Sequence, residues 1–246
     1  RDGTTRAWGI RLKEKRFQLL ILSPLERTWG IKMKNKKTLS MVMTALFMAI
    51  IAVMTFIPNV GYINLIVIKA TLLHVPVIVG SIVLGPKRGA VLGATFGITS
   101  LIKNTLEPSL LSFAFSPFYQ VGEIGGNAWS VVIALAPRIL VGIVPYYVFT
   151  GLEKLLNRKK IRRVVALSIS CASGALINTL LVMNLIYFCF REEFAAAKSI
   201  ALDTVYGAIL GIIAVNGVPE AVVAVVIGGA VSLALLRIVP QMERMG

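Results

Sequence analysis

The sequence predicts an all-α membrane protein: a compact bundle of about six transmembrane helices with both termini in the cytoplasm. Hydrophobic residues make up 57% of the 246 residues and charged residues only 15%, and the mean hydropathy is +0.81. A water-soluble domain of this length does not need so much apolar material to fill one core. Several apolar runs approach or exceed the roughly 18 to 20 residues that cross the hydrocarbon layer as a helix. Basic residues also collect in alternate loops, as in the cytoplasmic loops of multi-pass proteins.

Residues 1–32 differ from the rest of the chain. Their one apolar patch, Phe17–Leu22, is too short to span a membrane. Met33 is followed by basic residues and then at once by an apolar segment. We therefore expect residues 1–32 to be a leader, from cloning or an upstream extension, and residues 33–246 to form a single six-helix membrane domain. A surface-lying amphipathic helix is the alternative for the first segment.

Six apolar segments are expected to cross the membrane. Their predicted limits are 38–57, 66–84, 88–103, 128–150, 164–188 and 218–237. Two predicted outer connections are long, about 104–127 and 189–217. Because long connections can cover a binding site, function is expected on the face that carries them. The second connection is apolar enough that an additional membrane-embedded helix within it is an alternative.

The loops assign the orientation through their basic residues. Thirteen Lys and Arg residues fall on the predicted cytoplasmic side: Lys34, Lys36, Lys37, Lys87, Arg88, Lys154, Arg158, Lys159, Lys160, Arg162, Arg163, Arg237 and Arg244. Four fall on the outer side: Lys69, Lys103, Arg191 and Lys198. This bias predicts cytoplasmic termini and a multi-pass protein of the bacterial inner membrane. It also accounts for most of the formal charge of +15, so no nucleic-acid partner is expected.

Small residues recur at four-residue spacing on two predicted helices. The third helix carries Gly85, Gly89, Gly93 and Gly97, and the first carries Ala45 and Ala49. Such stripes allow two helix backbones to approach closely. For the glycines we favour packing inside the bundle over contact with a partner protein.

Arg138 is the most informative ionisable residue, because it lies near the middle of the fourth predicted span. A charge at this depth costs several kcal/mol unless it faces a polar cavity or a partner. The preceding Pro137 removes a backbone N–H and so releases a carbonyl locally, as broken helices do around binding sites. Arg138 is therefore interpreted as a substrate contact, with a structural ion pair to Glu123 or Glu220 as the alternative.

Further polar or aromatic residues in the predicted outer half complete the candidate binding set: Lys103, Asn104, Lys69, His74, Asn127, Phe115 and Asn178. A lone histidine is more often a satisfied interior group than a ligand contact. Cationic residues nevertheless outnumber the nearby acids. In a low-dielectric pocket, this excess favours an anionic ligand, for instance a carboxylate.

Aromatic residues cluster on or beside the first long outer connection. They are Phe113, Phe115, Phe118, Tyr119 and Trp129. Such a cluster is either an interfacial aromatic belt or a lid over a small organic molecule, with Ser116 and Asn127 as polar partners.

Motifs for catalysis are missing from the sequence. It contains no GxxxxGK[ST] phosphate loop, no HExxH and no GxSxG. Cys171 and Cys189 are 18 residues apart with no neighbouring histidine, so a metal site is not expected. We therefore expect a protein that is not an enzyme and that binds no metal or cofactor.

The run Ile68–Ala90, IKATLLHVPVIVGSIVLGPKRGA, resembles the signature between the second and third helices of S components of energy-coupling factor (ECF) vitamin transporters. The resemblance extends from Met33 to the carboxyl end. It implies a six-helix bundle that binds one vitamin near the outer face. It also implies docking on a module of a scaffold membrane subunit and two cytosolic ATPases, which perform the ATP hydrolysis. The pair Ala45 and Ala49 would then face the scaffold subunit.

The segment Ser112–Phe118 looks most like the pantothenate-specific members of this family. Pantothenate is a carboxylate, in agreement with the cationic pocket inferred from the residues. Pyridoxine or hydroxymethylpyrimidine is the alternative substrate. From other classes, a membrane scaffold or channel and an intramembrane transferase are the alternatives.

Overall fold

The computed structural model describes residues 36–57, 61–65, 68–121, 124–156 and 160–238. The chain divides into two compact units, residues 1–41 and 42–246. Within the first unit the described part is the start of the first helix, and the cavity described under the candidate site lies wholly within the second unit. The predicted leader, residues 1–32, falls outside the described residues.

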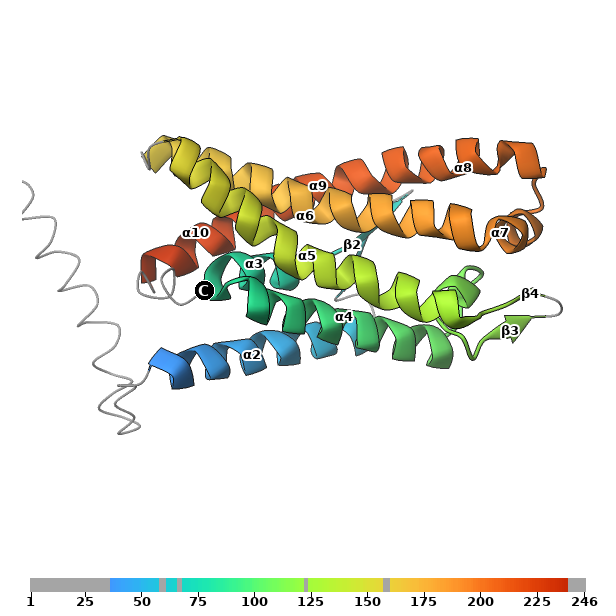
Figure 1. The fold of residues 1–246 in the computed structure, drawn as a ribbon, viewed down its shortest axis with the longest axis horizontal. Helices are drawn as coiled ribbons and strands as arrows, with labels where there is room; N and C mark the ends of the chain where they lie inside the picture. Colours follow the sequence, from blue (N-terminus) through green and yellow to red (C-terminus); the bar gives the residue numbers. More distant parts are fainter. Residues whose placement is uncertain (1–35, 58–60, 66–67, 122–123, 157–159, 239–246) are drawn as a thin grey trace, which may run out of the picture. The chain divides into compact units, whose positions relative to one another are not determined.

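The second unit is built mainly from helices. In chain order the helices are α2 (Lys36–Phe56), α3 (His74–Leu84), α4 (Pro86–Leu106), α5 (Ala128–Leu155), α6 (Lys160–Cys189), α7 (Arg191–Lys198), α8 (Val205–Ile212), α9 (Val218–Val223) and α10 (Gly229–Ile238). Two 3₁₀ turns, η1 (Ser112–Ala114) and η2 (Leu202–Thr204), and two π-helical turns, η3 (Ile213–Gly217) and η4 (Ala224–Gly228), connect or interrupt them. Helix α5 packs between α4 and α6, and α6 also contacts the segment from α8 to α10 (Figure 1).

Two short antiparallel hairpins lie between the helices. Strands β1 (Tyr62–Leu65) and β2 (Ile68–Thr71) pair with Tyr62 opposite Thr71. Strands β3 (Gln120–Val121) and β4 (Ile124–Gly125) pair with Gln120 opposite Gly125. The second hairpin leads directly into α5.

Four helical segments in the described residues are long and apolar enough to cross a membrane. They are Lys37–Phe56, Ala128–Leu155, Arg162–Cys189 and Leu202–Leu236. This confirms the predicted helical membrane fold, and the first, fourth and fifth predicted spans coincide with α2, α5 and α6. Helix α4 is 21 residues long, about 31 Å at 1.5 Å per residue, but it is less apolar. The number of crossings and the side of the termini stay predictions.

The predicted second span, 66–84, is wrong as a continuous helix. Its first part belongs to the β1–β2 hairpin, and α3 begins only at His74. β-Branched residues such as Ile63 and Ile68 favour extended backbone, and the Leu72 N–H closes the hairpin by donating to the Gly61 carbonyl over 2.9 Å. The remaining helix has 11 residues, about 16 Å, which is half of the hydrocarbon thickness.

The predicted long connection 189–217 and the start of the last span at 218 are also wrong. Helices α7 and α8 occupy that connection, and the last helical segment begins near Leu202. Pro219 lies inside this segment, at the start of α9, although proline lacks the N–H that an α-helix interior uses. The π-helical turn η3 just before it changes the hydrogen-bond pattern, so the chain stays helical through the proline.

The glycine stripe of α4 packs against α5, which confirms the interpretation as packing inside the bundle. A Cβ at Gly93 would collide with the main-chain carbonyl of Arg138, and one at Gly97 would lie 2.7 Å from the Ala134 carbonyl oxygen. Gly89 approaches the Gly142 backbone in the same way. These contacts let α4 and α5 touch backbone to backbone and so fix Arg138 beside α4.

Gly85, the fourth glycine of the predicted stripe, has a different role. It forms the junction between α3 and α4 with φ of 90°. This conformation is strained for residues with a Cβ, so glycine is required here for the turn and not for helix packing.

Replacing Gly93 by alanine is expected to destabilise the protein by about 1 to 3 kcal/mol, the usual cost of overpacking. The added methyl group meets backbone, which cannot move aside as a side chain can. The matched control is Gly151→Ala on α5, because nothing lies within 4 Å of a Cβ there. Thermal unfolding of the two variants in detergent measures the difference. An equal midpoint for both variants would contradict the close contact between α4 and α5.

Candidate functional site

A cavity of about 220 Å³ lies among α2, α4, α5, α6 and the segments that follow β2 and η1. Nine residues line it: Thr55, Leu73, Phe96, Ser100, Lys103, Asn104, Phe115, Arg138 and Asn178. Its wall combines two cationic side chains, two carboxamides, two hydroxyls and three apolar groups. The volume is below the roughly 300 to 1,000 Å³ of sites for drug-sized ligands. The cavity therefore suits a small metabolite with both charged and uncharged polar groups.

Arg138 reaches the cavity from the middle of α5, where it is 7% exposed. Its Nη1 donates a hydrogen bond of 2.6 Å to the Ile133 carbonyl. This carbonyl lies four residues before Pro137, which has no N–H to donate to it. The Ile133 carbonyl is thus free of a helical N–H partner, and its hydrogen bond with Arg138 orients the guanidinium. The local sequence Pro137-Arg138 therefore explains the position of the charge.

Two aromatic rings hold the Arg138 guanidinium from different parts of the chain. Its Cζ lies 5.5 Å from the ring centroid of Phe96 on α4 and 5.0 Å from that of Phe115, which follows η1. Both distances are within the range of cation–π attraction. Since α4, α5 and the loop after η1 all contribute, the guanidinium is fixed only when these three segments are packed together.

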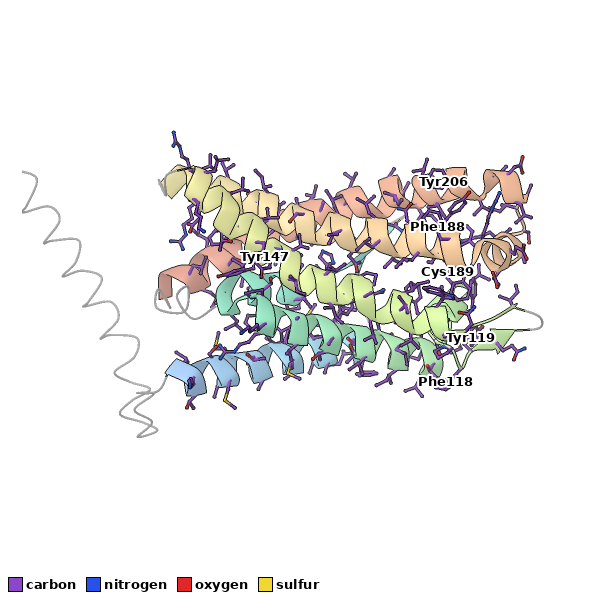
Figure 2. All side chains as sticks on the ribbon, viewed as in Figure 1. Phe118, Tyr119, Tyr147, Phe188, Cys189 and Tyr206 are labelled. Atoms are coloured by element: carbon purple, nitrogen blue, oxygen red, sulfur yellow. The ribbon has the colours of Figure 1, made fainter. Side chains whose placement is uncertain are left out.

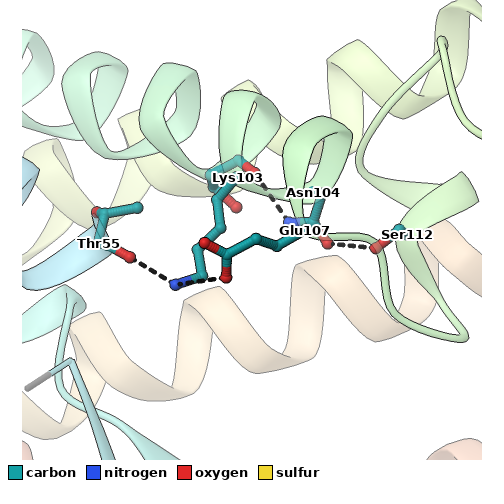
Figure 3. Close-up of polar contacts among 6 residues, drawn as sticks. Thr55, Lys103, Asn104, Glu107 and Ser112 are labelled. Atoms are coloured by element: carbon teal, nitrogen blue, oxygen red, sulfur yellow. Dashed lines mark hydrogen bonds and ion pairs between the residues drawn. The ribbon is translucent and has the colours of Figure 1, made fainter. Parts of the chain in front are cut away.

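Lys103 joins α4 to the end of α2. Its Nζ donates to the main-chain carbonyl of Thr55 over 2.7 Å and lies 3.6 Å from Oε2 of Glu107 (Figure 3). Thr55 is in the last turn of α2, where carbonyls have no helical N–H partner and carry the negative end of the helix dipole. The lysine therefore adds positive charge to the cavity and also caps a neighbouring helix.

Asn104 anchors the loop that carries Phe115. Its Nδ2 donates to the Ser100 carbonyl over 2.8 Å, and its Oδ1 accepts a 2.8 Å hydrogen bond from the Ser112 hydroxyl (Figure 3). Ser112 is the first residue of η1. Both ends of the Asn104 carboxamide are thus engaged within the protein, which makes it a positioning residue for the loop as well as part of the cavity wall.

The structure brings together five of the eight predicted binding residues. Those on the cavity wall are Lys103, Asn104, Phe115, Arg138 and Asn178. Two of the other three lie elsewhere. Asn127 caps α5, where its Oδ1 accepts the Trp129 N–H over 2.8 Å. His74 is buried at the start of α3 and is not part of the wall. Lys69 belongs to β2, and its side chain is outside the described residues.

The structural alternative for Arg138 was an ion pair with Glu123 or Glu220. Glu123 lies outside the described residues. Glu220 is buried on α9, and its Oε2 accepts a 2.9 Å hydrogen bond from the hydroxyl of Thr179 on α6. The carboxylate of Glu220 thus serves a contact between α6 and the last helical segment.

The predicted aromatic cluster divides between the two roles that were considered for it. Phe115 lines the cavity, and Phe113 is buried with its ring centroid 5.6 Å from that of Phe190. Phe118 is 78% exposed and Trp129 53% exposed; Figure 2 shows Phe118 on the outside of the ribbon near β3. The positions of Phe115 and Phe113 fit a cover for the cavity. Those of Phe118 and Trp129 fit a lipid-facing or interfacial location.

Sequence reasoning missed four residues of the wall: Thr55, Leu73, Phe96 and Ser100. Two of them could have been found. Phe96 and Ser100 precede Lys103 and Asn104 by the spacings that place residues on one face of a helix. Lys103 and Asn104 were candidates already, so they indicated which face of α4 lines the site. Nothing in the sequence singled out Leu73 as a wall residue. For Thr55 the only signal was a polar side chain within an apolar helix.

The family model for the ECF transporter, substrate-specific component, matches residues 39–228. The chain belongs to this family. All nine residues of the cavity wall fall within the matched segment of this substrate-specific component. Family membership and the apolar helices together make it a multi-pass membrane transport protein.

Two curated relatives resemble this substrate-specific component over most of their length. The pantothenic acid transporter PanT of Lactococcus lactis subsp. cremoris is 36% identical over 171 residues, which is 69% of this chain and 79% of the relative. The pantothenate transporter PanT of Leuconostoc mesenteroides subsp. mesenteroides is 31% identical over 211 residues, covering 84% and 95%. The resemblance drawn from the sequence motifs is confirmed.

Proposed function

We propose that this chain captures pantothenate from outside the bacterial cell membrane and delivers it to an energy-coupling module of a scaffold subunit and two ATPases. One observation carries the choice of ligand: the wall of the cavity includes Arg138 and Lys103 together with uncharged polar groups. The names of the two relatives support the same vitamin. In this role the chain binds and presents the substrate, and partner chains hydrolyse ATP.

The charge of the cavity supports an anion. Arg138 is buried, and a guanidinium matches a carboxylate because its N–H groups can donate two parallel hydrogen bonds. Its burial beside the rings of Phe96 and Phe115 limits contact of the guanidinium with water, which strengthens its attraction for an anion. Pyridoxine and hydroxymethylpyrimidine carry no carboxylate, so neither can form this pair of parallel hydrogen bonds with the guanidinium.

The remainder of the wall supports a ligand with an uncharged polar half. Pantothenate carries, besides its carboxylate, one amide, two hydroxyls and a dimethyl-substituted carbon. The carboxamide of Asn178 and the hydroxyl of Ser100 can hydrogen-bond such groups, and Leu73 can contact the methyl groups. The wall therefore has a chemical counterpart for each part of this vitamin.

Vitamin-dependent stabilisation of the purified chain in detergent tests the proposal. A ligand present at 100 times its dissociation constant adds about 2.7 kcal/mol to the stability of the protein. Pantothenate is expected to raise the unfolding temperature, and pyridoxine and hydroxymethylpyrimidine at equal concentration are not. A larger rise with either of those two would transfer the proposal to that vitamin. No rise with any of them would favour the scaffold or channel alternative.

A further inference from the structure

The two asparagines of the cavity wall differ in their hydrogen bonding. The Asn104 carboxamide is engaged at both ends. The Oδ1 atom of Asn178 is buried and has no hydrogen-bond partner in the described part of the chain. More than nine in ten buried polar groups have a partner, and a buried acceptor left without one costs about 1 to 3 kcal/mol in proteins generally. A polar group in this state on a cavity wall is suited to a ligand.

The backbone that carries Asn178 is nevertheless held firmly. The next residue, Thr179, donates its hydroxyl to Glu220 over 2.9 Å, and a Cβ on Gly217 would lie 3.4 Å from the Thr179 side chain. Neighbouring residues on a helix point about 100° apart. When Thr179 faces the last helical segment, Asn178 is turned away from it to the cavity. The buried carboxylate of Glu220 thus helps to position Asn178, whose Oδ1 has no hydrogen-bond partner within the described ranges.

We propose that Asn178 recognises the hydroxyl-bearing end of the ligand, so that the ligand lies with its carboxylate at Arg138 on α5 and its hydroxyls at α6. This inference rests on the proposed function, since it assumes the anion at Arg138. In pantothenate the amide is two carbons from the carboxylate, and the hydroxyls lie at the far end. A hydroxyl can rotate to donate to Oδ1 and can accept from Nδ2. The substrate class is then an anion with a remote hydroxyl, and an acid without hydroxyls binds more weakly.

Isothermal titration with two ligands and two proteins tests this assignment. The ligands are pantothenate and N-(3,3-dimethylbutanoyl)-β-alanine, which keeps the carboxylate, the amide and the branched carbon but lacks both hydroxyls. The variant is Asn178→Leu, which keeps a similar volume without polar atoms. The matched control is Asn184→Leu on the same helix, since Asn184 is exposed and its Nδ2 donates to the Leu180 carbonyl.

Asn178→Leu is expected to weaken pantothenate binding about three- to tenfold, the range for a neutral hydrogen bond. It should change the affinity for the analogue less than twofold. The wild-type chain should prefer pantothenate over the analogue by at least the same factor, and Asn184→Leu should change neither affinity. An equal loss for both ligands would overturn the inference, because Asn178 would then act through packing or the amide.

The wild-type comparison needs no variant and decides the matter even if Asn178→Leu does not fold. Equal wild-type affinity for the two ligands overturns the inference. Failure of the proposed function gives a separate result: wild type binds pantothenate no better than pyridoxine, or Arg138 variants bind it normally. A third result is also distinct. If wild type prefers pantothenate over pyridoxine and Arg138 variants bind it weakly, but Asn178→Leu binds it as wild type does, only the assignment of Asn178 is wrong.

Discussion

Replacing Arg138 by Gln is expected to weaken pantothenate binding about tenfold to more than a hundredfold. This corresponds to about 1.5 to 3 kcal/mol, the range for hydrogen bonds to charged groups. The guanidinium lies near the rings of Phe96 and Phe115, and Arg138 is buried, so little water is present to weaken its attraction for a carboxylate. A bidentate carboxylate offsets the cost of burying this charge more fully than a neutral ligand can. Arg138→Lys should restore little, because an ammonium lacks the planar fork.

The measurement is titration of wild type and variant with pantothenate and with pantothenol, its neutral alcohol analogue. Wild type should bind the acid more tightly, and Arg138→Gln should lose most of that preference. Arg191→Gln is the matched control. Arg191 also lies over an aromatic ring, 5.4 Å from the Tyr187 centroid, and its Nη2 donates to the Leu202 carbonyl over 2.8 Å, but it is not on the cavity wall.

Equal wild-type affinity for acid and alcohol would contradict an anionic binding mode. Tighter binding of pyridoxine than of pantothenate would do the same. Arg138 would then return to the alternative interpretation of a structural charge. Because the substitution also removes the hydrogen bond to the Ile133 carbonyl, the unfolding temperature without ligand must be measured beside the affinity. A fall in stability with unchanged affinity would assign Arg138 to the fold alone.

Enlarging both Ala45 and Ala49 to Trp is expected to abolish vitamin uptake and assembly with the scaffold subunit. Both alanines are exposed on α2, whereas Phe47 and Ile51 of the same helix are buried. Two alanines one turn apart allow another helix to approach closely, and two indole rings would prevent it. Because neither alanine is buried, pantothenate binding to the isolated chain should stay nearly unchanged.

The experiment combines uptake in cells, co-purification with the module and titration of the isolated chain. Leu176 and Leu180 offer the matched control, because they are also one turn apart and exposed, on α6. Their double substitution by Trp should leave uptake and assembly intact. Loss of pantothenate binding by the alanine variant, with assembly preserved, would show that the pair serves packing within the bundle and not docking.

The features predicted correctly depend on local sequence and on the solvent. Apolar length predicted α2, α5 and α6 to within a few residues, because a membrane core requires backbone hydrogen bonds to be satisfied inside each helix. The limits of α3 and of the last segment were wrong. In each case an apolar run is compatible with more than one backbone conformation. Before α3 the chain forms a hairpin, and before Pro219 a π-helical turn lets the helix continue through the proline.

The sequence by itself determined the class of protein and its family, and it predicted a cationic ligand site, since composition, the Ile68–Ala90 run and an arginine within an apolar span are local features. Only the tertiary structure decided which candidates meet. Arg138 and Asn178 are 40 positions apart on different helices, yet both line one cavity. Spacing along one helix cannot tell that the Asn104 side chain accepts a hydrogen bond from Ser112 while the Oδ1 of Asn178 has no partner among the described residues. A hydrogen bond depends on distances between separate elements, and these distances are fixed only when the helices pack, as Gly93 lets α4 and α5 do.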